Sequence, residues 1–211
     1  MSRRFSVRTM SPAALAALLA AAAMIPVSGA QEAVPTPLTI NTARITIDGS
    51  SNVHAWTAST TDVRVTRAQA PGLKPAPDIW RNIVEPGALA AFEISVTAAS
   101  LSSPKDGLDK NMHRALKVQE HPEITFRLAR LEAGDAGALR GIGVLRIAGV
   151  EREVALDLTA VPDGATMSVT GRVRLLMTDF GIKPPKAMLG MLKTDPNVTV
   201  TFETVLAVPL T

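Results

Sequence analysis

From Leu38 to the end of the chain, apolar and polar residues alternate with a period of two, and this alternation constrains the fold more than any other feature. A period of two is typical of β-strands that bury one face and expose the other. The sequence therefore predicts an all-β protein with eight strands. Their cores lie at 38–47, 53–68, 92–97, 123–128, 139–148, 153–159, 169–175 and 198–203.

Three of the connections are short and rich in Gly, Asp or Pro, as hairpin turns require: 132–138, 147–151 and 161–165. They predict that the fourth to seventh strands form an antiparallel meander. Eight strands with one apolar face each must bury that face by closing into a barrel or by stacking as a sandwich. We expect an eight-stranded antiparallel β-barrel similar to a lipocalin, because closure removes exposed sheet edges.

Three longer connections are expected to cap the ends of this barrel. The segment 69–87 is rich in proline, and 178–196 contains two adjacent prolines. The segment 102–118 is predicted to be the one short helix, with Ser103 as its N-cap and Pro104 at its first position. No repeat or composition change indicates a second domain.

The first 30 residues have the pattern of a cleaved export signal. Arginines near the start are followed by an alanine-rich apolar run, and small residues stand at positions 28 and 30. The apolar run is shorter than the roughly 20 residues of a membrane-spanning helix. We therefore expect residues 1–30 to be a signal peptide, 31–211 to be the folded domain, and the protein to be periplasmic and not membrane-spanning.

Charge and cysteine content narrow the function further. The whole chain has 22 Lys+Arg against 19 Asp+Glu, and loss of the three arginines in the first 30 residues leaves 19 of each. Because the numbers of basic and acidic residues in the domain are equal, its net charge gives no basis for nucleic-acid binding. The chain has no cysteine, so its stability in an oxidising compartment must come from burial rather than disulfides.

The residues that face inward decide what the barrel does. An eight-stranded barrel is just wide enough to be filled by side chains or to hold one small ligand. Most inward residues are mid-sized, and Gly141, Gly143 and Gly171 are expected to leave room for a long hydrocarbon chain. A packed, ligand-free structural barrel is the alternative. The predicted cavity wall comprises Trp56, Phe92, Ile94, Val96, Phe126, Leu128, Leu145, Leu156, Leu158, Val169, Gly171, Val173, Val200 and Phe202.

The opposite face of the strands is charged, with Glu93, Arg127, Asp157, Arg172 and Glu203 among its residues. An outer-membrane barrel presents an apolar band to lipid and aromatic girdles at its rims. The charged outer face is the reverse of that pattern. The sequence therefore predicts a barrel with an apolar interior and a charged outer surface exposed to water.

Four stretches in chain order resemble the YceI-like family of periplasmic barrels. They are "GSSNVHAWTA" (49–58), "ISVTAASLSSPKDGLDKNMHRALKVQEHPEITF" (94–126), "GVLRIAGVEREVALDL" (143–158) and "MTDFGIKPPKAMLG" (177–190). The resemblance implies a protein that binds a polyisoprenoid, an isoprenoid quinone or a similar long amphiphile without covalent attachment, and that acts in transport, storage or stress responses rather than catalysis.

The histidines raise a competing hypothesis, a metal-dependent enzyme built on Asp109, His113 and His121. Zinc needs three or four converging ligands, and the spacing lacks the regularity of known zinc motifs. No nucleophile motif accompanies these residues. We expect no catalytic residue, no metal and no other cofactor; Asp109 and His113 are instead expected to pin the helix by hydrogen bonds or to contact a lipid head group.

Two lysines, Lys183 and Lys186, flank a proline pair and are a second candidate for head-group contact. Trp80, in the proline-rich segment, is expected to act as a lid. The sequence leaves the oligomeric state open, and a homodimer is one option.

Overall fold

A computed structural model describes residues 38–70, 73, 79–134, 138–187 and 191–208, without the side chains of 186, 187 and 192. The predicted signal peptide therefore lies outside the described residues.

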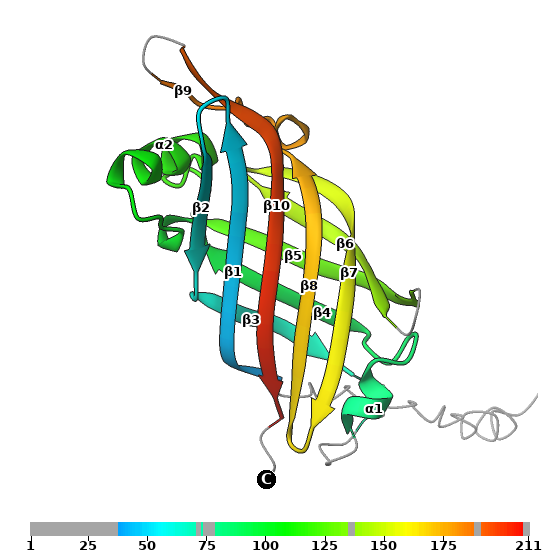
Figure 1. The fold of residues 1–211 in the computed structure, drawn as a ribbon. Coiled ribbons are helices and arrows are strands. Elements are labelled where there is room, and N and C mark those ends of the chain that lie inside the picture. The colour runs from blue at the N-terminus through cyan, green and yellow to red at the C-terminus, as the bar shows by residue number, and fades with distance from the viewer. Residues whose placement is uncertain (1–37, 71–72, 74–78, 135–137, 188–190, 209–211) are drawn as a thin grey trace, which may run out of the picture. The chain divides into compact units, whose positions relative to one another are not determined.

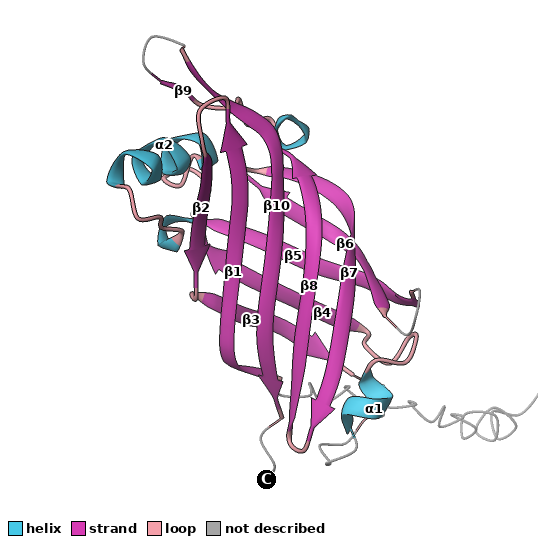
Figure 2. Cartoon of the chain, viewed as in Figure 1, coloured by secondary structure: helices cyan, strands magenta, loops and turns pink. Residues whose placement is uncertain are grey.

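An antiparallel sheet makes up most of the described chain (Figures 1 and 2). Its strand order is β2-β1-β10-β8-β7-β6-β5-β4-β3, and β9 pairs only with β10. The strands are β1 (Thr39–Ser51), β2 (Ala55–Thr60), β3 (Val63–Gln69), β4 (Ala91–Thr97), β5 (Glu123–Ala133), β6 (Leu139–Ile147), β7 (Val150–Asp163), β8 (Thr166–Leu176), β9 (Lys186–Ala187) and β10 (Leu192–Ala207). The sheet curls around its apolar face, as the tilted strands in Figure 1 show, so the predicted all-β fold and antiparallel curled architecture are confirmed.

The expected number of eight strands is wrong because one predicted strand divides and a short one was missed. The segment 53–68 forms β2 and β3, which pair with different neighbours. Between them the chain turns sharply: Val63 N–H donates to the Thr61 carbonyl (3.0 Å), and Asp62 N–H donates to the Thr60 hydroxyl (3.0 Å). Alternation continues across this turn, so periodicity alone could not locate it.

The predicted meander of the fourth to seventh strands is confirmed as β5-β6-β7-β8. The β6–β7 turn holds Ala148 at φ 48° and Gly149 at φ 82°. Positive φ at both central residues is the geometry of the turns that suit two-residue hairpins. These tight turns fix the register that points one set of side chains inward.

The two edges of the sheet meet without a continuous ladder. In the described part of the chain, β3 pairs with β4 and not with β1 or β2. Apolar side chains fill this seam instead, with Ala43, Val63 and Val96 in one buried cluster. Near one end, Ser59 on β2 and Ser102 exchange two backbone hydrogen bonds of 2.8 and 3.0 Å. The two edges of the curled sheet are therefore held together by packing and one short bridge.

Among the described residues, two α-helices flank the curled sheet at opposite ends (Figure 1): α1 (Ile79–Ile83) and α2 (Asp106–Leu116). The helix predicted at 102–118 is present but begins at Asp106, because the Ser103 hydroxyl bonds both N–H and C=O of Lys105 and forms a turn there. It ends at Leu116, and the residue that caps it, Lys117, has a left-handed φ of 54°. No helix among the described residues combines the length and the apolar character that crossing a bilayer requires.

Candidate ligand cavity

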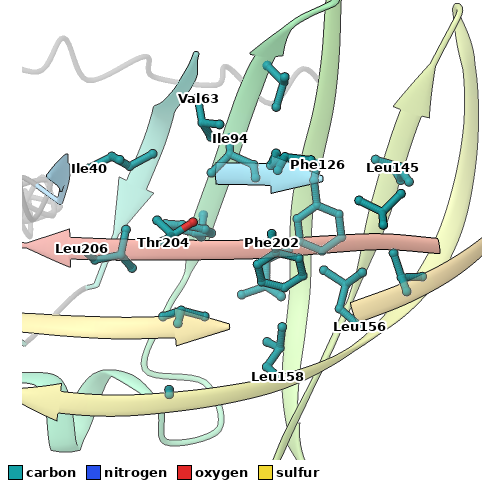
Figure 3. A pocket seen from close by; sticks show the side chains of 18 of the residues that line it. Ile40, Val63, Ile94, Phe126, Leu145, Leu156, Leu158, Phe202, Thr204 and Leu206 are labelled. Atoms are coloured by element: carbon teal, nitrogen blue, oxygen red, sulfur yellow. The ribbon is translucent and has the colours of Figure 1, made fainter. Parts of the chain in front are cut away.

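The apolar faces of the strands enclose a cavity of about 220 Å³ (Figure 3). Residues on all the long strands line it, together with α1. Most of the predicted wall residues lie in its lining: Phe92, Ile94, Val96, Phe126, Leu128, Leu145, Leu156, Leu158, Val169, Val173, Val200 and Phe202. The inward faces of the strands thus surround space instead of meeting one another throughout.

The lining of this cavity is almost entirely hydrocarbon. Among the described residues that line it, Thr204 on β10 carries the one hydroxyl (Figure 3). Trp80 on α1 adds an indole whose N–H is buried and has no hydrogen-bond partner among the described residues. A surface of this kind offers a ligand little beyond apolar contact, which favours a hydrocarbon chain.

The expectation that inward glycines leave open room is wrong. The ring of Phe126 lies within 2.6 Å of the position that a Cβ on Gly143 would occupy. Phe202 covers Gly171 in the same way, and Gly171 is not among the residues that line the cavity. These glycines admit aromatic rings against the sheet, so the free volume lies further inward.

A second cavity of about 480 Å³ lies between the sheet and α2. Trp56 lines this cavity rather than the first one. Its lining is more polar, since it includes side chains from the β1–β2 hairpin, the start of α2 and β10. These polar residues are Ser51, His54, Thr57, Ser103, Lys105, Asn111 and Thr194.

The two cavities share part of their walls: Ile47, Ile124, Ile147, Leu175 and Val200 line both. They are therefore adjacent along the inside of the curled sheet, and these five aliphatic side chains form a ring where they meet. The lining becomes polar only on the α2 side of the ring. The site is thus an apolar chamber followed by an amphipathic one.

Helix α1 closes the apolar chamber at the other end. Ile79, Trp80 and Ile83 are each no more than 2% exposed and belong to a buried cluster with Leu206. Sequence reasoning placed Trp80 in a loop, because the prolines around it mask a five-residue helix. In the structure Trp80 is buried in the cluster of α1 side chains that closes this end of the chamber.

The predicted pinning role of Asp109 and His113 is visible in their hydrogen bonds. The Asp109 carboxylate accepts from Ser103 N–H (2.8 Å), and His113 Nε2 lies 2.8 Å from the Leu101 carbonyl. Both partners belong to the backbone that bridges to β2 through Ser102. These two side chains therefore tie α2 to the sheet edge.

The three histidines do not converge. The ring of His121 packs against Gly149 in the β6–β7 turn, His113 faces Leu101, and His54 lines the second cavity. In the described part of the chain, no three His, Asp or Glu side chains are grouped so as to hold a metal ion. The geometry therefore does not support an enzyme built on Asp109, His113 and His121.

Of the two lysines proposed for head-group contact, Lys183 is exposed and lines neither cavity. The side chain of Lys186 lies outside the described residues. Pro185, between them, lines the second cavity. Lys105, which sequence reasoning did not select, lines this cavity beside the start of α2; its position next to the predicted helix was the available signal.

Several wall residues were also missed, among them Ile40, Ile45 and Ile47 on β1. The pairing of β1 with β10 is shifted between Ile40 and Thr42, so the inward phase changes along the strand. An irregular alternation in this segment was the only sequence signal of that bulge.

Comparison with known proteins places this geometry among solved folds. Residues 39–206 match the family model described as YceI-like domain. Comparison with curated proteins gives no match.

Solved structures with the same fold have low sequence identity to the chain. BcnA of Burkholderia cenocepacia is 13% identical with a TM-score of 0.61, over 78% of this chain and 96% of that one. A polyisoprenoid binding domain from Saccharophagus degradans, implicated in plant cell wall breakdown, is 11% identical with a TM-score of 0.62, over 83% and 100%. A Campylobacter jejuni YCEI protein is 15% identical with a TM-score of 0.53, over 70% and 82%.

Proposed function

The chain belongs to the YceI-like family, and we propose that it binds a polyisoprenoid or a similar long-chain amphiphile in its interior and carries it through the periplasm. The observation that carries this proposal is the hydrocarbon lining of the inner cavity, in which Thr204 has the one hydroxyl among the described residues. A chain of isoprene units presents the same surface chemistry as this lining. The domain from Saccharophagus degradans, described as polyisoprenoid-binding, has the same fold and supports the choice of ligand class.

Burial of the hydrocarbon tail contributes favourable binding free energy without any polar contact to the tail. Each buried methylene contributes about 0.8 kcal/mol, so about ten supply roughly 8 kcal/mol, the free energy of a micromolar complex before the cost of association. The tail therefore supplies the main favourable contribution, which grows with its length and must exceed the cost of association, and the polar groups orient the ligand.

The polar residues indicate that orientation. They gather in the chamber beside α2, whereas the end beside α1 is plugged by Ile79, Trp80 and Ile83. We propose that the head group lies in the α2 chamber and that the tail extends past the ring of shared aliphatic residues toward α1. Among the described residues that line this chamber, His54 and Lys105 are the titratable ones and none is a carboxylate. This composition favours a head group that accepts hydrogen bonds or carries negative charge.

The proposed role is carriage without chemistry. The histidines and Asp109 form no catalytic grouping, and Asp109 and His113 are already engaged with backbone groups. Two arguments support the proposed periplasmic location. The first 30 residues have the pattern of an export signal, and YceI-like proteins are typically periplasmic.

Tryptophan fluorescence gives a direct test, because the chain has two tryptophans and no tyrosine. Trp80 and Trp56 each line one chamber. A quinone bearing a long isoprenoid tail should quench this fluorescence saturably, whereas the same quinone ring without the tail should quench only weakly at equal concentration. Equal quenching by both compounds, or none by either, would contradict the proposal.

A further inference from the structure

We propose that the α2 end of the protein carries a membrane-docking tip, made of Val53 on the β1–β2 hairpin and Met191 at the approach to β10, which places the amphipathic chamber against a lipid bilayer. This inference rests on the proposed lipid-binding function and names the surface from which the ligand is loaded. Four observations support it: exposure, bracing, position and charge.

Exposure is the first observation. Among the described side chains, three large hydrophobic residues are exposed: Val53 and Met191 at 68% and Val161 at 54%. Single exposed apolar residues are common on proteins and mean little alone. Val53 and Met191, however, belong to segments that are joined to each other, whereas Val161 stands on β7 toward the α1 end.

The two segments are joined through Asn52. Its side-chain amide donates to the Met191 carbonyl (2.9 Å) and accepts from Lys193 N–H (2.8 Å), while its own N–H donates to the Lys193 carbonyl (3.0 Å). Three hydrogen bonds thus hold residues that are about 140 positions apart in the sequence. The turn that presents Val53 is itself fixed, because the Ser51 hydroxyl accepts from the N–H groups of Val53 and His54.

These hydrogen bonds matter because a membrane anchor works best when its apolar side chain is already fixed in an exposed position before the protein meets the bilayer. An apolar side chain on a braced turn cannot fold back onto the protein without breaking hydrogen bonds. The tip therefore keeps the Val53 side chain exposed to water, where its hydration is unfavourable. Burial at the boundary between the head groups and acyl chains of a bilayer would remove that cost.

Position links the tip to the cavity. His54 follows Val53 directly and lines the amphipathic chamber, and Thr194, which lines it too, is three residues beyond Met191. In Figure 1 the β1–β2 hairpin and the start of β10 stand at the same end of the sheet as α2. A bilayer that covered Val53 and Met191 would thus lie at the chamber, so a lipid could pass between them with little exposure of its tail to water.

Charge at this end suits an anionic bilayer. The lysines whose side chains are described belong to α2, its ends, the β8–β10 connection or the start of β10: Lys105, Lys110, Lys117, Lys183 and Lys193. Lysine stems can lie along an apolar surface while the ammonium group reaches phosphate. Acids are present too, namely Asp106, Asp109, Asp179, Asp195 and Glu120, and Arg114 adds one more cation on α2. Hydrogen bonds from the backbone and then the side chain of Asn197 keep the pKa of the Asp195 carboxyl below its usual value, so it stays ionised.

Since these charges nearly offset one another, apolar insertion is the main contribution and anionic lipid a secondary one. Binding should therefore be detectable on vesicles of phosphatidylcholine alone and stronger on equal parts of phosphatidylethanolamine and phosphatidylglycerol. Added salt should weaken binding to the second type toward the level of the first.

Vesicle flotation of the full domain tests the inference with a matched pair of variants. Val53→Ser combined with Met191→Ser should lower the vesicle partition coefficient about tenfold or more, since two apolar side chains lose their burial. Val161→Ser removes an exposed apolar residue from the opposite end and should leave the coefficient unchanged. All three substituted positions are exposed, so unchanged urea midpoints should confirm that the variants are folded.

Uptake of a long-tailed isoprenoid quinone distinguishes this inference from the proposed function. The double variant should take up the quinone normally from dilute detergent but slowly from vesicles. The tip proposal is overturned if wild-type protein does not float with either vesicle type, or if the double variant floats and extracts lipid as wild type does. It is equally overturned if Val53→Ser with Met191→Ser changes the oligomeric state instead, because the tip would then be a protein interface. Absence of quinone uptake from detergent by the wild-type protein would contradict the proposed function. The flotation result would then still test the membrane-docking tip by itself.

Discussion

The aromatic ring of Phe202 lies over the backbone of Gly171, its partner on the adjacent strand, in the space that a side chain on Gly171 would need. A Cβ placed there would be 2.8 Å from Phe202 Cε1 and 2.7 Å from the Asp157 carbonyl oxygen. The glycine therefore sets how far the ring lies from the centre of the cavity.

Gly171→Ala should consequently destabilise the fold by about 1–3 kcal/mol, because both the ring and a neighbouring strand must shift. Gly107→Ala is the matched control: nothing lies within 4 Å of its Cβ position in α2. There alanine should be neutral or stabilise the helix by about 0.5–1 kcal/mol. Urea unfolding of the two variants measures both effects. Equal stabilities would show that the ring does not depend on Gly171.

Filling the apolar chamber should abolish ligand uptake. Val169 lines this chamber, so Val169→Trp should occupy the tail site and reduce the binding of a long-tailed quinone by tenfold or more. The same substitution at Val161, which is 54% exposed on β7, should leave binding intact. Fluorescence titration, with the added tryptophan calibrated in each variant, gives the comparison. Undiminished affinity in Val169→Trp would place the tail elsewhere.

Asp109 is expected to stabilise the fold without contacting the ligand. Asp109→Ala leaves the Ser103 N–H without its acceptor, and should cost about 1–3 kcal/mol of unfolding free energy. Lys110→Ala, at the next and exposed position of α2, should change stability by less than about 0.5 kcal/mol. Chemical denaturation and quinone titration of both variants separate the two roles. An Asp109→Ala protein with normal stability and lost binding would instead assign Asp109 to the head group.

The titration of Asp195 is expected to depend on Asn197. Hydrogen bonds from the backbone N–H and then the side chain of Asn197 lower the pKa of Asp195 in the folded state. The stabilisation that they bring is present above the unfolded-state pKa and is lost as pH falls through the lowered folded-state value. Asn197→Ala removes only the side-chain hydrogen bond, so the pKa should rise part of the way toward its usual value. Carbon-detected NMR of the Asp195 carboxyl would show this shift, and an unchanged titration would contradict the assignment.

Much of the fold could be predicted because alternation and turn residues are local signals. The runs around Phe126, Leu156 and Phe202 each specify an inward face without reference to the rest of the chain. The features that were missed depend on long-range pairing. The division of 53–68 into two strands depends on which neighbour each half finds, and the bulge near Ile40 changes the inward phase of β1.

The site was predicted in a similar, partial way. A period of two identifies which side chains face inward, and most of these line the cavity. It does not reveal that aromatic rings lie over Gly143 and Gly171, because this depends on side-chain packing between strands. Nor does it reveal that a five-residue helix at Ile79–Ile83 closes one end, since so short a helix has no periodic signature.

The account as a whole depends on a lipid occupying the hydrocarbon-lined chamber. Native mass spectrometry of the protein isolated from its own cells, without detergent, tests this most directly. The account predicts a mass above that of the polypeptide by one long-chain amphiphile, which is released on denaturation and is missing from Val169→Trp. A bare polypeptide mass that remains unchanged after incubation with polyprenols and isoprenoid quinones would contradict it.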